Sequence, residues 1–159
     1  KVYGGFNTSL SWKGFDLSAI FAYSIGGYIY NRDVTMILHN GSLEGRDWST
    51  EILRRWTPDN RYTDVPALST TSNNWNSAST RFLQNNSYMR LKNLTLSYNL
   101  PKQWISKLSL SSVQVYVQGD NLFTIHRNQG LDPEQGITGI TYYRYPAMRT
   151  ISGGINVSF

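Results

Sequence analysis

The chain has 159 residues, of which 14% are aromatic and only 16% are charged, and its net charge is +5. High aromatic content with little charge excludes intrinsic disorder, and the excess of β-forming residues over Ala, Glu and Lys argues against a helical bundle. The positive charges form no block or stripe suited to phosphates, so no nucleic-acid partner is predicted, and the absence of cysteine excludes disulfides.

Alternation of apolar and polar residues predicts five long strands. They lie at about 2–12, 15–29, 87–100, 112–125 and 148–159. Between the first two, Lys13-Gly14 has the spacing of a two-residue hairpin turn, with Trp12 and Phe15 beside it on the apolar face.

The strand at 87–100 changes phase halfway along its length. Leu94 and Leu96 share one face, whereas Leu91 has the opposite parity. The change predicts either a bulge near Asn93 that restores the phase, or a strand end that rises out of the apolar zone.

The connections alternate in length, as they do in outer-membrane barrels with short periplasmic turns and long extracellular loops. A two-residue turn at 13–14 precedes a long loop at 30–86, and a medium turn at 101–111 precedes another long loop at 126–148. The first long loop is predicted to hold a short helix from Ser49 to Trp56. The strands are about twice the usual soluble length and match membrane-spanning strands.

Five strands are fewer than the eight of the smallest membrane barrels, and an open sheet edge cannot face lipid. We therefore expect an all-β fold: an antiparallel transmembrane β-barrel fragment, with about five C-terminal strands of a larger barrel and two long extracellular loops. A first residue that is Lys1 and not Met agrees with a fragment. The last residue, Phe159, follows an alternating strand, which is typical of the C-terminal signal for barrel assembly. No apolar run is long enough for a membrane-spanning helix, and no signal peptide is found.

Several segments resemble, in the same order, the C-terminal end of SusC/RagA-type TonB-linked outer-membrane transporters. They are GGFNTSLSWKGFDLSAIFAYSIGG (4–27), RRWTPDNRYTDVP (54–66), RLKNLTLSYNLP (90–101), VQVYVQGDNLFTI (113–125), GLDPE (130–134) and YPAMRTISGGINVSF (145–159). The resemblance implies a 22-stranded barrel with an N-terminal plug that imports glycans or peptides. Residues 1–159 would then form its last five strands and would contain no plug domain.

The resemblance also implies an orientation, a location and partners. The Lys13-Gly14 turn and Phe159 would face the periplasm of a bacterial outer membrane, and loops 30–86 and 126–148 would face outward. The partners would be the remaining barrel and its plug, a SusD-like surface lipoprotein, outer-membrane lipid, and TonB through the missing N-terminal part. Two alternatives stay open: another outer-membrane barrel, such as a siderophore receptor or porin, and a soluble β-sandwich that binds carbohydrate.

Aromatic side chains are the candidates for substrate or partner contact, because ring faces stack on sugars and hydroxyls bond their polar edges. They are Tyr28, Tyr30, Trp48, Trp56, Trp75 and Tyr116, with packing in the wall, plug or loop as the alternative. Four residues are candidates for the lipid interface: Trp12, Phe15, Arg90 and Lys92. Basic side chains reach such interfaces, although a bulge could instead turn Arg90 and Lys92 into the lumen.

No catalytic, metal or cofactor site is predicted. His39 and His126 stand alone, without a second ligand at metal-binding spacing. Asp120, Asp132 and Glu134 follow no calcium-loop pattern, and an Asp before Pro more simply shapes a turn. The sequence therefore predicts the wall of a transporter and not an enzyme.

Overall fold

A computed structural model describes the chain except residues 42, 72–76, 109, 129–131 and 135–137. The described chain divides into two compact units. The sheet unit consists of Lys1–Gly27, Asn86–Pro133 and Tyr145–Phe159, and the loop unit consists of Tyr28–Asn85 and Glu134–Arg144.

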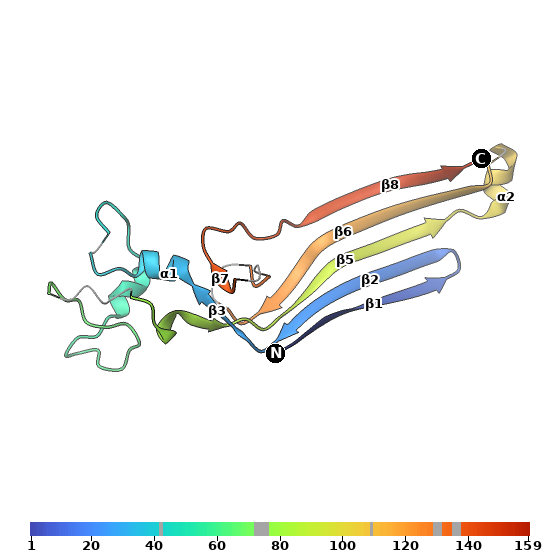
Figure 1. Cartoon of the computed structure of the whole chain (residues 1–159). Helices are drawn as coiled ribbons and strands as arrows, with labels where there is room; N and C mark the ends of the chain where they lie inside the picture. Colours follow the sequence, from blue (N-terminus) through green and yellow to red (C-terminus); the bar gives the residue numbers. More distant parts are fainter. Residues whose placement is uncertain (42, 72–76, 109, 129–131, 135–137) are drawn as a thin grey trace. The chain divides into compact units, whose positions relative to one another are not determined.

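The sheet unit is a five-stranded antiparallel sheet in which each strand pairs with the next one along the chain (Figure 1). Its strands are β1 (Val2–Trp12), β2 (Phe15–Ile25), β5 (Tyr88–Asn99), β6 (Ser112–His126) and β8 (Thr150–Ser158). They lie where the alternation predicts them, with one exception.

The exception is the end of β2. The strand predicted at 15–29 stops at Ile25, so the prediction is wrong beyond that residue. Gly26 and Gly27 follow with φ angles of 77° and 89°, a left-handed backbone that glycine adopts readily. These two glycines end the pairing, and residues Tyr28–Asn31 form a separate strand, β3, in the loop unit.

The register gives the sheet one apolar and one polar face. Residues paired across β1, β2 and β5 form apolar rows, such as Trp12, Phe15 and Tyr98 beside the first turn. The apolar face also carries Val2, Phe6, Leu10, Leu17, Phe21, Leu94, Leu96, Val115, Val117, Ile151, Ile155 and Val157. Many of these side chains are exposed, so this face needs lipid or protein to cover it.

The height of the apolar face fits a bilayer. The 11 residues of β2 extend about 33 Å at the usual rise per residue. With the tilt of about 40° that barrel strands adopt, this length spans about 25 Å, the height of the apolar band of outer-membrane barrels.

The β1–β2 turn is formed by Lys13 and Gly14 with φ angles of 48° and 89°, the type I′ geometry that suits strand twist. Aromatic residues gather around it: the Phe15 and Tyr98 rings lie 4.5 Å apart, and the Lys13 ammonium lies 5.0 Å from the Trp12 ring. Helices α2 (Lys102–Ile105) and η4 (Ser106–Leu108) and the end of β8 lie at this same end of the sheet unit (Figure 1). No helix of the described residues combines the length and apolarity needed to cross a membrane.

A bulge in β5 restores the alternation of apolar and polar residues, which is one of the two predicted alternatives. The register with β2 steps from Leu91 to Asn93, so Lys92 is the extra residue. On the other side, β6 bulges at the same height, where Asn121 has a φ of 51°. The bulge keeps Leu91 on the apolar face and turns Arg90 to the polar face.

The loop unit has short elements around a small core. They are β3 (Tyr28–Asn31), α1 (Arg32–Ile37), η1 (Thr50–Arg54), η3 (Thr80–Phe82), β4 (Leu83–Asn85) and β7 (Ile140–Thr141). Leu38, Ile52 and Val65 form the core, with Val34 packed against it. The helix predicted at 49–56 is present as the shorter η1, whose cap is the Ser49 hydroxyl accepting from the Glu51 N–H.

The five-stranded sheet is a fragment of a larger barrel. Within the described residues, the outer edges of β1 and β8 have no neighbouring strand. The second sheet contains only strands of two to four residues, so the fold is not a sandwich of two comparable sheets. Pairing with further strands would satisfy the backbone N–H and C=O groups along both edges.

The two faces predict unequal effects on the free energy of unfolding for two neighbouring substitutions in β8. Ile151→Arg places a charge at mid-height of the apolar face and is expected to lower the free energy of unfolding by about 2–4 kcal/mol. Ser152→Arg, the matched control on the polar face, is expected to have a clearly smaller effect. Denaturant unfolding of the protein containing this chain, in phospholipid bilayers, measures both. Equal losses would contradict the assignment of the faces.

Candidate functional site

Side-chain hydrogen bonds connect polar residues within and between the strands on the polar face of the sheet. Asn93 donates to Asp120 at 2.7 Å, and Gln118 donates to the same carboxylate at 3.2 and 3.3 Å. Thr95 donates to Asn93 at 2.9 Å. This network fixes polar groups along a surface that can face water or a polar solute.

Tyr116 lies on this polar face, opposite Gly154 of β8. A β-carbon at Gly154 would come within 2.7 Å of the Tyr116 hydroxyl oxygen, so the phenol ring covers the glycine. The absence of a side chain at Gly154 thus determines how Tyr116 lies against the wall.

A buried ion pair lies at the end of the sheet opposite the β1–β2 turn. Arg90 Nη2 and Asp132 Oδ1 are 2.5 Å apart, with side chains only 4% and 7% exposed. Arg90 Nε donates to Thr124 Oγ1 on β6 at 2.8 Å, and Asp132 Oδ2 accepts from the Ala147 N–H at 2.7 Å. One side-chain pair therefore links β5, β6 and both arms of the 127–149 connection.

The ion pair belongs to a set of bonds at the points where the chain leaves and re-enters the sheet unit. The Asn86 N–H donates to the Gly27 carbonyl at 3.1 Å, and the Asn86 side chain donates to the Pro133 carbonyl at 3.0 Å. Asp132 in turn accepts a hydrogen bond from the Ala147 N–H. The four passages between the units are thus tied to one another within the sheet unit.

The expectation that Arg90 lies at a lipid interface is wrong. The bulge at Lys92 turns Arg90 to the polar face, where Asp132 holds it in a buried ion pair. Lys92 itself is the bulge residue and is partly exposed. From the sequence, Asp132 was expected only to shape a turn. Its pairing with Arg90 could not be predicted, because the two residues lie far apart in the chain and leave no local pattern.

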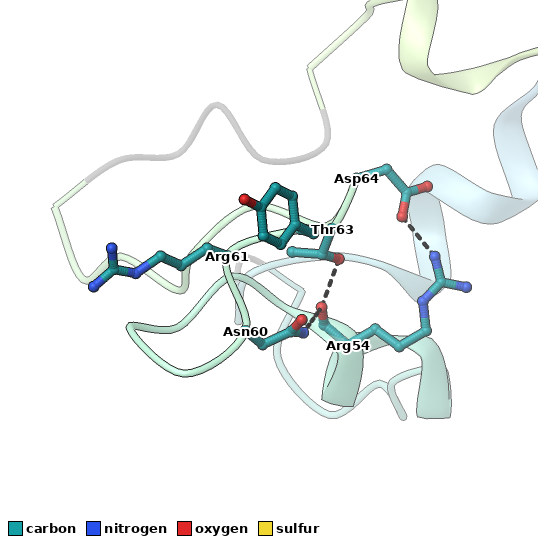
Figure 2. Close-up of a pocket in the computed structure, with 6 residues that line it drawn as sticks. Arg54, Asn60, Arg61, Thr63 and Asp64 are labelled. Carbon is teal, nitrogen blue, oxygen red and sulfur yellow. Dashed lines mark hydrogen bonds and ion pairs between the residues drawn. The ribbon is translucent and has the colours of Figure 1, made fainter.

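A hairpin at 54–66 forms a shallow open pocket in the loop unit (Figure 2). Arg54 pairs with Asp64 at 2.5 Å, and the Arg54 carbonyl accepts from Thr63 and Asn60 at 2.6 and 2.9 Å. These bonds lie within the hairpin, while Arg61 points away from them (Figure 2). Burial lowers the pKa of the nearby Arg81 guanidinium, and the charges of Asp64 and Glu51 act against that shift.

The predicted aromatic residues that the structure describes in the loop unit do not form one cluster. Trp48 meets the fully buried His39 edge to face at 5.4 Å, and Tyr30 meets Phe82 edge to face at 6.1 Å. Tyr28 and Trp56 are exposed. Trp75 lies outside the described residues.

No protein-family model matches the chain. It is 34% identical to TonB-dependent receptor P3 of Formosa agariphila over 98% of this chain, and 28% identical to TonB-dependent receptor SusC of Bacteroides thetaiotaomicron over 99%. It spans only 16% and 15% of those two proteins. Among solved structures, the RagAB peptide transporter superposes with a TM-score of 0.86 at 35% identity, covering 99% of this chain and 17% of that chain.

The two ion pairs differ in burial, so we expect that breaking them lowers the free energy of unfolding by unequal amounts. Asp132→Ala leaves the buried Arg90 guanidinium without its carboxylate and is expected to cost about 3–5 kcal/mol, with faster amide exchange at Ala147. Asp64→Ala breaks the exposed pair, whose side chains are 58% and 74% exposed, and is expected to cost less than about 1 kcal/mol.

The double replacement Arg90→Met/Asp132→Leu should recover much of the loss, because no unpaired charge is left buried. Unfolding and hydrogen exchange of the complete protein measure these effects. Similar losses for Asp132→Ala and Asp64→Ala would contradict the role given to the buried pair.

Proposed function

This chain is a barrel segment of the SusC/RagA family of TonB-dependent outer-membrane receptors, and on that premise we propose that it forms part of the wall of a nutrient importer for glycans or peptides. One observation carries the proposal: a single sheet has an apolar face of bilayer height and a hydrogen-bonded polar face. The apolar face meets lipid, and the polar face lines the path of a solute. The named relatives are receptors and a transporter, and we assign this chain no catalytic role or cofactor.

In this proposal the short-turn end of the sheet faces the periplasm. Trp12 and Phe15 lie in its aromatic row, where rings anchor a barrel at the membrane interface. Lys92, the partly exposed bulge residue of β5, stays a candidate for the lipid interface, because the flexible stem of a lysine lets its ammonium reach toward headgroups. Phe159, which continues the alternation of β8, is our candidate for the barrel-assembly signal.

The loop unit then faces outward, and its candidates for contact with a substrate or a SusD-like lipoprotein are Tyr28, Tyr30, Trp48 and Trp56. Trp75 is a further candidate that lies outside the described residues. The similarity to SusC and to the RagAB peptide transporter supports a partner of this kind. Tyr116 contributes to the lumen wall. The rest of the barrel, the plug and the contact with TonB are supplied by parts of the protein outside this chain.

The orientation predicts which residues a membrane-impermeant thiol reagent reaches. This chain has no cysteine, so a single substitution adds one reactive thiol to it, and the unsubstituted receptor controls for labelling elsewhere. We expect Tyr62→Cys, at a fully exposed loop position, to be labelled on intact cells, and Lys102→Cys, beside a short turn, only after the outer membrane is permeabilised. The opposite pattern would reverse the orientation.

The importer role predicts uptake that depends on the complete receptor. Cells lacking it should lose uptake of labelled oligopeptides or oligosaccharides, and a protonophore should block uptake in complemented cells. A surface lipoprotein should copurify with the receptor in mild detergent. Unchanged uptake of all these solutes in the deletion strain would refute the importer role, and uptake of iron–siderophore complexes instead would favour a siderophore receptor.

A further inference from the structure

A cluster of tyrosines and arginines lies in the loop unit where α1 approaches the residues after β7. Asp33 Oδ1 accepts from the Tyr143 backbone N–H at 2.9 Å, and Arg46 Nη1 donates to the Tyr143 hydroxyl at 3.0 Å. The Tyr142 and Tyr143 rings lie 4.4 Å apart at 52°, and the Arg32 guanidinium lies 4.5 Å from the centre of the Tyr142 ring. Three stretches far apart in the sequence thus form one Tyr–Arg cluster (Arg32, Asp33, Arg46, Tyr142 and Tyr143).

The backbone of Tyr143 is held in an unfavourable conformation. Its φ of 47° lies in the left-handed region, which residues with a β-carbon rarely adopt and which costs on the order of 1–3 kcal/mol. The bonds from Asp33 and Arg46 hold it there. Even so, the Tyr143 side chain stays 62% exposed. The chain therefore stabilises a strained residue without burying its ring, which leaves the ring available to a ligand.

The two arginines of the cluster carry unneutralised charge. No carboxylate among the described residues forms an ion pair with Arg32 or Arg46, and both side chains are exposed. Stacking on Tyr142 occupies one face of the Arg32 guanidinium and leaves the N–H groups at its edge for other acceptors. The Asp33 carboxylate, which accepts from the Tyr143 N–H, keeps its negative charge; two guanidinium groups against one carboxylate leave the cluster with one net positive charge, which favours an anion.

We infer that the Tyr–Arg cluster is a binding subsite for acidic peptides, an inference that rests on the proposed importer function. The edges of Arg32 and Arg46 bind Asp or Glu carboxylates, whose planar shape guanidinium groups match with paired hydrogen bonds. The exposed ring of Tyr143 packs against the adjoining peptide. Arg32 covers one face of Tyr142 and the Tyr143 ring lies 4.4 Å from it, which limits the open ring faces on which a sugar could stack. The similarity to the RagAB peptide transporter favours a peptide as the ligand.

The test compares a glutamate-containing hexapeptide with its glutamine counterpart, by calorimetry on the complete receptor in detergent. The wild type is expected to bind the glutamate peptide about tenfold more tightly, a difference of about 1.4 kcal/mol. The double variant Arg32→Gln/Arg46→Gln should bring the ratio close to one, with most of the change coming from weaker binding of the glutamate peptide. The matched control is Arg61→Gln, an exposed arginine of the same unit outside the cluster, which should keep the ratio.

A ratio that survives the double variant, or that Arg61→Gln abolishes equally, overturns the inference. So does a wild type that binds neither peptide. Tighter binding of a glucuronate oligosaccharide that the double variant alone abolishes would assign the cluster to acidic sugars instead. The importer proposal fails by a separate result, unchanged solute uptake in the deletion strain, so the two failures are distinguishable.

Discussion

Backbone hydrogen bonding is the constraint on which this chain depends. In hydrocarbon an unpaired N–H or C=O costs several kcal/mol, so a chain that crosses lipid as strands must pair every strand on both edges. Strands β2, β5 and β6 meet this condition within the chain, and β1 and β8 meet it only with strands contributed from elsewhere. The antiparallel ladder fixes the register, and the register separates the side chains into an apolar and a polar face.

The bulge at Lys92 reconciles two demands on β5. Without it, Arg90 would share a face with Leu94 and Leu96, and its charge would lie among apolar side chains. With the extra residue, Arg90 lies on the polar face, where it forms an ion pair with Asp132 and donates a hydrogen bond to Thr124. A buried ion pair contributes little net stability but is expensive to break, and we therefore interpret this pair as fixing where the 127–149 connection lies.

The loop unit combines a small apolar core with surfaces that keep their polar groups outward. Leu38, Ile52 and Val65 give it a packed centre, while the 54–66 hairpin is held by bonds among its own residues. Exposed aromatic and basic groups can then vary without disturbing the sheet. This division agrees with the general pattern in which a rigid scaffold carries connecting segments that do the recognition.

The strands, their apolar face and the first turn could be predicted from the sequence, because each follows from a two-residue period or a local turn signal within a few positions. The change of phase in β5 was also visible, but the sequence left a bulge and a rising strand end as alternatives, and only the register with β2 decides for the bulge. The resemblance in six segments also pointed to the family. The sequence did not determine where β2 ends, because Ile25 and Ile29 continue the alternation and only the left-handed backbone at Gly26 and Gly27 interrupts it.

Tertiary structure alone decided the partners of Arg90, Tyr116 and Tyr143. Asp132, Gly154 and Asp33 lie 42, 38 and 110 positions away from these residues, and separations of that size leave no periodic signal in the sequence. The lipid-interface prediction for Arg90 failed because the bulge at Lys92 reverses its side of the strand, and the carboxylate that pairs with it there lies too far along the chain to leave a local pattern.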